Sequence, residues 1–274
     1  MTSLRKHALG AAAALVALVV AFAPPLRAGD LDWSRHTAGL PFVIGMERGR
    51  EECKFTGLAP MLFFTSATDD QCPIFAARTW KDEDVRAKVA GYTPILIDWD
   101  AADPEFRKKC RADCVPTIAW LDHDEKWIWA CIGSAPGDIV RKEAEIARRS
   151  APKPREPAPG MKTLAELSKR VEDAAAAKDV KAQLAAIAEI RRIRLGEAYQ
   201  VAARAADERL TKQGMDAISA ATPVLEDKKA ASNKKLDAKK ALEKILDDYG
   251  AEHAVGKAAA AAIEKAFGKQ KPKK

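Results

Sequence analysis

The chain has 274 residues, of which 31% are charged, and its formal net charge is +7. This length allows one or two domains with hydrophobic cores. The surplus of positive charge lies in residues 151–274, where 26 lysines and arginines accompany 18 acidic residues. Outside the basic tail at residues 269–274 these charges alternate in sign along helical faces, and no aromatic platform or nucleic-acid-binding motif accompanies them. The composition therefore argues against a nucleic-acid-binding protein.

Residues 1–28 have the pattern of a secretory signal peptide. A positive stretch, RKH, precedes an apolar run over residues 8–23, and a small-residue cleavage site near Ala28 follows two prolines. The apolar run is short for a membrane span, so we expect cleavage rather than retention as an N-terminal anchor. No later segment is long and apolar enough to span a bilayer. We therefore expect a secreted, periplasmic protein without a membrane span after cleavage.

Residues 29–150 alternate between strand and helix patterns, which favours an α/β domain with parallel strands. Strands are predicted for the apolar stretches APMLFFTS, TPILIDWD, PTIAWL and WIWACI, and the last two flank the turn DHDEK as a β-hairpin. Helices are predicted over residues 40–54, 72–91, 104–112 and 136–149.

The composition changes at residues 151–160, where four prolines predict a stiff, extended linker. All six tryptophans precede this segment, and mostly alanine, lysine, glutamate and leucine follow it. Residues 161–268 therefore predict a second, all-α domain, either a bundle of four to six antiparallel helices or a short helical-repeat array. Residues 241–267 resemble a tetratricopeptide-like helix pair.

Three local patterns in the helical domain predict a helix cap, a helix end and the buried faces of two helices. Thr163 and Glu166 have the spacing of an N-terminal capping box. Gly250 is placed to end a helix. Apolar residues at helical spacing predict the buried faces of the first and last helices, at Leu164, Leu167 and Val171 and at Val255, Ala259, Ile263 and Phe267.

The mature chain has five cysteines: Cys53, Cys72, Cys110, Cys114 and Cys131. An odd number leaves at least one thiol free or paired between chains, in a compartment where disulfides persist. Cys110 and Cys114 lie in a helix-to-strand turn, where they could form a small structural disulfide. Two free or otherwise paired thiols, or a relocated redox pair, are the alternatives. Cys131, in a strand, is expected to be a buried small hydrophobe.

Residues 40–150 resemble a thioredoxin-fold domain. The main marker is CVPT at residues 114–117, because a Val-Pro-Thr or Ile-Pro-Thr sequence opens the third core strand in that family, with its proline in the cis form. The segments DPEFRKK and LDHDEKWIWACIG resemble secreted members of the family. The resemblance implies that Val115, Pro116 and Thr117 border a groove that pairs with extended peptide backbone.

The redox site of the thioredoxin family is a Cys-x-x-Cys motif at the start of the first long helix. Counting forward from Phe64 and back from Trp80 places that motif at Asp69, Asp70, Gln71 and Cys72. The second cysteine is present, and aspartate replaces the first.

The missing first cysteine is the attacking thiolate in this chemistry, and the second resolves the mixed disulfide. The resemblance therefore implies a site without its nucleophile. The buried acid that the family often has before the strand end is Phe63 here. Asp69 is expected to cap the helix instead. Another register makes Cys72 the first cysteine, with Phe75 in place of the second, which gives a monothiol site.

Our first hypothesis is a secreted thioredoxin-like protein that binds or scaffolds other proteins without catalysis. Its groove would hold extended or secreted polypeptides, and its helical domain would bind a further protein. The alternative is a thiol–disulfide oxidoreductase or isomerase that uses Cys72 alone or with Cys110 or Cys114. A third hypothesis is a structural envelope protein. We expect no cofactor, and no metal site, because none of the four histidines has another at ligand spacing.

Overall fold

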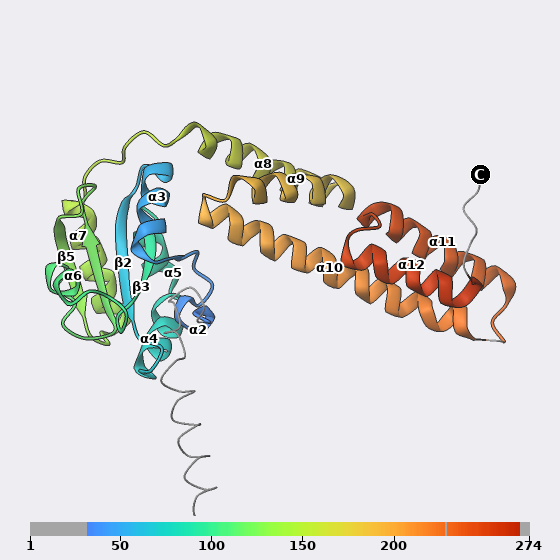
Figure 1. Ribbon diagram of the computed structural model, residues 1–274, viewed down its shortest axis with the longest axis horizontal. Coiled ribbons are helices and arrows are strands. Elements are labelled where there is room, and N and C mark those ends of the chain that lie inside the picture. The colour runs from blue at the N-terminus through green and yellow to red at the C-terminus, as the bar shows by residue number, and fades with distance from the viewer. Residues whose placement is uncertain (1–31, 228, 269–274) are drawn as a thin grey trace, which may run out of the picture.

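The computed structural model describes residues 32–227 and 229–268, so the predicted signal peptide and basic tail lie outside the described residues. Two parts follow each other along the chain (Figure 1). Residues 32–150, the sheet region, combine a five-stranded mixed sheet with helices. Residues 159–268, the helical region, have only helices among their described residues. The chain is a mixed α/β protein with a C-terminal helical region, as the sequence predicts. No helix in the described ranges is both long and apolar enough to cross a bilayer.

The strands of the sheet region are β1 (Val43–Ile44), β2 (Ala59–Thr65), β3 (Tyr92–Asp98), β4 (Thr117–Leu121) and β5 (Trp127–Ile132). Their order across the sheet is β1-β3-β2-β4-β5. β1 and β2 pair parallel to β3, whereas β4 is antiparallel to both β2 and β5. The predicted parallel pair and the predicted terminal hairpin are thus confirmed.

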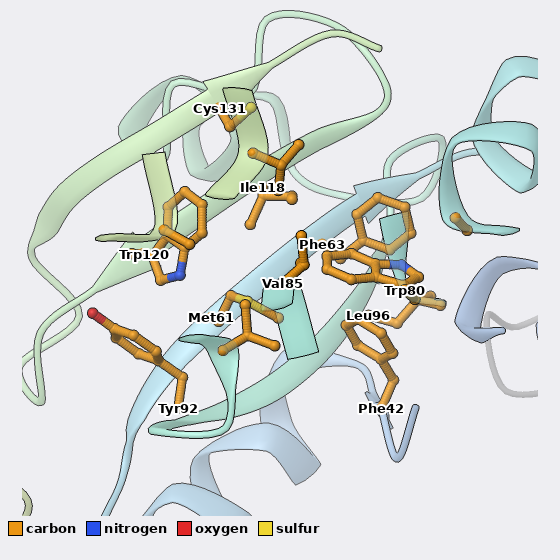
Figure 2. Packing of buried hydrophobic residues seen from close by; sticks show 14 of the residues in the cluster. Phe42, Met61, Phe63, Trp80, Val85, Tyr92, Leu96, Ile118, Trp120 and Cys131 are labelled. Atoms are coloured by element: carbon orange, nitrogen blue, oxygen red, sulfur yellow. The ribbon is translucent and has the colours of Figure 1, made fainter. Parts of the chain in front are cut away.

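The helices of the sheet region are α2 (Ser34–Thr37), α3 (Met46–Thr56), α4 (Gln71–Thr79), α5 (Glu83–Val89), α6 (Pro104–Lys109) and α7 (Gly137–Ser150). α4, α5 and α7 cover one face of the sheet, and α3 and α6 cover the other. Successive side chains of β2 point to opposite faces of the sheet, so the side chains on each face meet apolar partners. Phe63 packs against Trp80 on the first face (Figure 2), and Phe64 packs against Phe106 on the second. This explains why β2 is buried along its whole length.

Two predicted elements of the sheet region differ in the structure. The single helix predicted over residues 72–91 is two helices, because the chain turns after Trp80 and Asp82 caps α5. The Asp82 carboxylate accepts hydrogen bonds from the backbone N–H groups of Asp84 and Val85. The helix predicted over residues 40–54 begins only at Met46, because the β-branched residues before it form β1 and pair with β3.

The helices of the helical region are α8 (Pro159–Ala176), α9 (Val180–Ile193), α10 (Glu197–Glu226), α11 (Ser232–Tyr249) and α12 (Ala254–Phe267). α10 runs past both helical hairpins (Figure 1). Its first half packs with α8 and α9 in one hydrophobic cluster, and its second half packs with α11 and α12 in another. Figure 1 shows this region extending away from the sheet region, with α11 and α12 at its far end.

Some sequence predictions for the helical region were wrong. Thr163 does not cap a helix, because α8 already begins at Pro159, whose fixed backbone angle suits a first helical position. Phe267 is 46% exposed, since it lies in the last turn of α12. The other apolar residues predicted to be buried on α8 and α12 are buried, and Gly250 ends α11 as predicted.

The segment between the two regions is attached at one end to α3. Residues 151–158 have no regular secondary structure, and the last two residues of the predicted linker already belong to α8. The backbone N–H of Arg155 donates to the carbonyl of Gly57, and that of Ala158 donates to the carbonyl of Phe55. Phe55 itself packs in the cluster of α8, α9 and α10.

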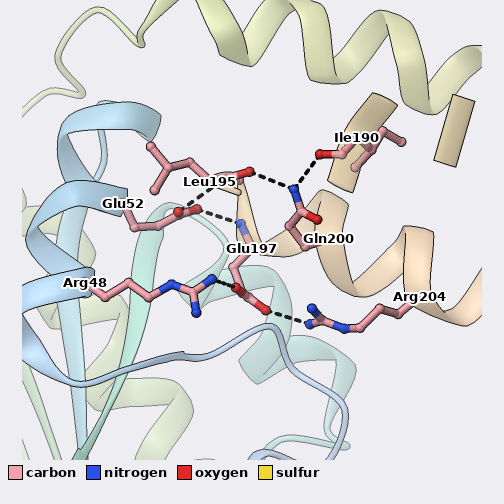
Figure 3. Close-up of polar contacts among 8 residues, drawn as sticks. Arg48, Glu52, Ile190, Leu195, Glu197, Gln200 and Arg204 are labelled. Atoms are coloured by element: carbon pink, nitrogen blue, oxygen red, sulfur yellow. Dashed lines mark hydrogen bonds and ion pairs between the residues drawn. The ribbon is translucent and has the colours of Figure 1, made fainter. Parts of the chain in front are cut away.

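A buried carboxylate joins the two regions at the start of α10 (Figure 3). Glu52 of α3 accepts hydrogen bonds from the backbone N–H groups of Gly196 and Glu197, at 3.0 and 2.8 Å. The Glu197 side chain in turn accepts from Arg48 at 2.8 Å and from Arg204 at 2.6 Å. An acid of the sheet region thus supplies the N-terminal cap that α10 lacks in its own sequence.

Candidate functional site

The candidate site lies at the end of β2, where residues 66–70 connect this strand to α4. The antiparallel register of β2 and β4 places Phe64 opposite Thr117. The turn that follows β2 and the Val115–Pro116 peptide that precedes β4 therefore lie at the same edge of the sheet. The peptide bond between Val115 and Pro116 is cis, as the sequence predicts.

Cys72, in the first turn of α4, has 0% of its surface exposed. The backbone N–H of Ser66 donates to its Sγ atom at 3.5 Å. Burial raises the pKa of the Cys72 thiol, and hydrogen bonding with Thr65 offsets this only in part. Because the thiolate is the reactive form of cysteine, this thiol is both inaccessible and kept protonated.

Asp69, where the thioredoxin resemblance implies a cysteine, is bonded to the start of α4. Its Oδ1 atom accepts from the backbone N–H of Gln71 at 2.8 Å, and its carbonyl accepts from that of Cys72 at 3.1 Å. The helix itself begins at Gln71 with Asp70 at the N-cap, whose side chain makes no capping bond. The prediction that Asp69 is the N-cap was wrong, because Asp70 holds that position, but the Asp69 carboxylate accepts from a helix N–H as expected.

A network of polar residues around this turn was missed by the sequence analysis. The Ser66 hydroxyl bonds to the Asp100 carboxylate and to the Thr68 hydroxyl. Asp98, at the end of β3, lies beside Thr65 in the sheet register and accepts from the backbone N–H of Asp100 at 3.1 Å. Burial raises the pKa of Asp98. Asp98 is the last residue of β3 and Asp100 lies two residues after it, and acids at a strand end could have indicated a role at the sheet edge.

A buried histidine from the N-terminal helix completes the network. A hydrogen bond of 2.7 Å joins His36 Nδ1 to Thr65 Oγ1. Burial lowers the pKa of His36, which favours the neutral ring in this position. Since His36 and Thr65 are 29 residues apart, only the packing of α2 on α4 brings them together.

The other side of the predicted groove is the segment that enters β4. Val115 is half-buried, whereas Pro116 and Thr117 are buried. The Thr117 hydroxyl donates to the carbonyl of Cys114 at 2.7 Å, and the carbonyl of Pro116 accepts from the backbone N–H of Gly133. The backbone around Pro116 is therefore held in place by bonds to its own neighbours.

One large apolar side chain is exposed directly after the Asp69–Cys72 segment. Ile74 has 56% of its surface exposed. It lines a shallow cleft of about 340 Å³ between α2 and α4, together with Pro73 and Ala38. An exposed isoleucine in a cleft can contact an apolar side chain of a bound segment.

The other four cysteines differ in burial and position. All five thiols are free in the structure, and a Cys110–Cys114 disulfide stays a prediction. Cys110 packs under α6, on the face opposite α4, and burial raises its pKa to about 11. Cys114 is exposed. Burial also raises the pKa values of Cys53 and Cys131 to about 11.

Neither comparison with known proteins connects the chain to a family. No model of a protein family matches the sequence, and a search of curated proteins finds no match. Among the described residues, no group of three or more His, Cys, Asp and Glu side chains could hold a metal ion.

Proposed function

We propose that this protein is a secreted, periplasmic thioredoxin-like module that binds extended polypeptide without exchanging thiols. The observation that carries the proposal is the pair of Asp69 and Cys72. An acid that bonds to the helix start occupies the position of the attacking cysteine, and the cysteine that remains is buried and protonated. Such a site has the groove for a polypeptide but lacks the thiolate that attacks a disulfide.

The order of elements in the sheet region supports the thioredoxin-like assignment. Parallel β2 and β3 are joined by a helical crossover, a cis proline precedes antiparallel β4, and a hairpin and a terminal helix follow. The proposed peptide site runs between Asp69–Cys72 and Val115–Pro116, with Ile74 as its apolar anchor. A partner segment would place an apolar side chain against Ile74.

The helical region supports a second role in this proposal, as the surface for another protein partner. It carries exposed apolar side chains at Met215, Leu236 and Phe267, spread over three helices. Glu52 fixes the start of α10 on α3 and so connects the helical region to the sheet region. The protein would then act as a scaffold between a polypeptide and a second protein.

Reductase and binding assays test the proposal together. Residues 29–274 should not reduce the disulfides of insulin with dithiothreitol as donor, beyond the uncatalysed rate. A thiol reagent should label one cysteine, Cys114, rapidly in the native protein and all five in urea. Turnover that disappears in Cys72→Ser or in Cys114→Ser would overturn the proposal and support the oxidoreductase alternative.

Peptide binding is measured with reduced, carboxymethylated α-lactalbumin, an unfolded polypeptide that has no thiol to exchange. We expect saturable binding that Ile74→Asp weakens at least fivefold. Ile146→Asp is the matched control, because Ile146 is an exposed isoleucine of α7 outside the proposed groove. Equal effects of both substitutions, or no binding at all, would contradict the groove.

A further inference from the structure

A further cavity lies where the sheet region meets the helical region, and neither Asp69 nor Cys72 lines it. It is a cleft of about 690 Å³, within the size range of small-molecule sites in proteins. Its walls come from both regions and are mostly apolar, with Leu40, Val43, Leu58 and Val89 on one side and Met161 and Ala198 on the other. Clefts between two structural units are a preferred place for ligands.

Two acids line this cleft, and both are already paired. Each oxygen of Glu52 accepts a backbone N–H at the start of α10, and the two oxygens of Glu197 accept from Arg48 and Arg204. Two arginines therefore compensate the charge of Glu197, and the N–H groups at the start of α10 stabilise that of Glu52. The same bonds hold the two walls of the cleft together.

The third charged side chain of the lining is Arg86, and it differs from the two acids. It extends from α5, is exposed, and has no ion pair or side-chain hydrogen bond among the described residues. The cleft thus combines apolar walls with one uncompensated positive charge at its rim. This combination is complementary to a molecule that has an apolar body and an anionic head group.

The polar groups of the cleft also indicate what does not suit it. A buried peptide segment needs partners for its backbone N–H and C=O groups. Here the hydroxyls of Thr56 and Thr93 bond to each other at 2.9 Å, and β1 pairs with β3 beside them. A ligand whose buried part is hydrocarbon needs no such partners.

From these observations we propose that the cleft binds an amphipathic carboxylate, such as a medium-chain fatty acid, with its chain against the apolar walls and its carboxylate on Arg86. The proposal is independent of peptide binding at the edge of the sheet. It assigns a second, small-molecule site to the junction of the two regions.

The test compares decanoate with decan-1-ol, which has the same chain and no charge, by displacement of a fluorescent dansylamino-undecanoate from residues 29–274. Saturable binding at one site per chain is expected. Arg86→Gln should weaken decanoate about fivefold, as the loss of one exposed ion pair predicts, and leave decan-1-ol unchanged. Lys162→Gln, which removes a charge beside the lining residue Met161, should change neither.

Occupancy of the cleft is tested by filling it. Ala198 is exposed on α10, so Ala198→Trp places a bulky side chain over the cleft without entering the core, and should abolish binding. Ala202 lies one turn later on the same helix, is also exposed, and does not line the cleft. The Ala202→Trp variant should therefore bind decanoate normally. Thermal unfolding confirms that both variants are folded.

Three results would overturn the proposal. These are the absence of saturable decanoate binding, equal weakening of decanoate and decan-1-ol by Arg86→Gln, and normal binding by a folded Ala198→Trp variant. Displacement of the probe by carboxymethylated α-lactalbumin as effective as that by decanoate would instead identify the cleft as a peptide site.

Discussion

Glu52 and Glu197 are 145 residues apart in the sequence, yet the carboxylate of the first accepts a hydrogen bond from the backbone N–H of the second. α10 begins after Gly196, which has no side chain to cap it, and its first N–H groups are buried against α3. The helix is thus completed by an acid from the other region.

Glu52→Ala should therefore destabilise the protein more than an ordinary surface substitution. It removes the acceptor of two buried N–H groups, and we expect the free energy of unfolding to fall by about 2 kcal/mol. Urea unfolding measures the loss. Glu51→Ala is the control, since the neighbouring side chain is exposed, and its effect should stay within about 0.5 kcal/mol. Equal losses in both variants would show that the cap contributes nothing.

Gly214, in the middle of α10, should be intolerant of alanine although alanine favours helices by about 1 kcal/mol over glycine. A Cβ atom there would lie 2.4 Å from the Val255 side chain and 2.9 Å from the Tyr249 ring. We expect Gly214→Ala to lower the free energy of unfolding by about 1–3 kcal/mol, as overpacking does in tightly packed cores. Gly91→Ala has open space around its Cβ and should be neutral or slightly stabilising. A stabilised Gly214→Ala variant would disprove this packing.

Asp69→Cys should restore a dithiol at the start of α4. If Asp69 occupies the position of the first cysteine, the new thiol and Cys72 lie three residues apart at a helix start, in the range of a disulfide. Thiol titration in denaturant after mild oxidation should then find four free thiols out of six, and reductase activity should appear. Asp70→Cys, one residue later, should keep all six. Six free thiols in both variants would argue against the register proposed for the motif.

The free energy of unfolding should decrease at alkaline pH, because three thiols of the folded chain have raised pKa values. Burial raises the pKa values of Cys53, Cys110 and Cys131 from the ordinary 9.0 to about 11. Between these values the unfolded chain loses protons that the folded chain retains, so rising pH favours unfolding. Their contribution is complete below pH 9 and is lost as the pH approaches 11.

We expect the free energy of unfolding to decrease by at least about 2 kcal/mol between pH 8.5 and 11. Measurements with a reducing agent exclude disulfide exchange. The double variant Cys110→Ala, Cys131→Ala should show a shallower decrease, because two of the titrating groups are gone. A decrease as steep as that of the unchanged protein would mean that other groups cause it.

Local patterns in the sequence were sufficient for most elements of the sheet region. The short apolar stretches predicted all of β2 to β5, and the position of CVPT predicted the cis peptide bond at Pro116. These features depend on residues that are close together in the sequence, so local sequence patterns predict them. The proposal that Asp69 replaces the first cysteine of a motif depends on a local pattern of the same kind.

The sequence did not predict features in which a residue contacts a partner far along the chain. The sequence did not indicate that α10 would be a single helix of 30 residues, since its cap, Glu52, precedes it by more than a hundred residues. It did not indicate the hydrogen bond between His36 and Thr65, or the compensation of Glu197 that leaves Arg86 as the unpaired charge of the cleft.

The sequence by itself therefore determined where β2 to β5 and most of the helices lie, and it contains the pattern on which the proposed loss of the motif cysteine depends. Only the tertiary structure decided that Cys72 is buried and protonated, and that an acid of the sheet region completes α10. The physical reason is that hydrophobic periodicity depends on residues close together in the sequence. Burial, charge compensation and cavities depend on contacts between residues that are far apart in the sequence.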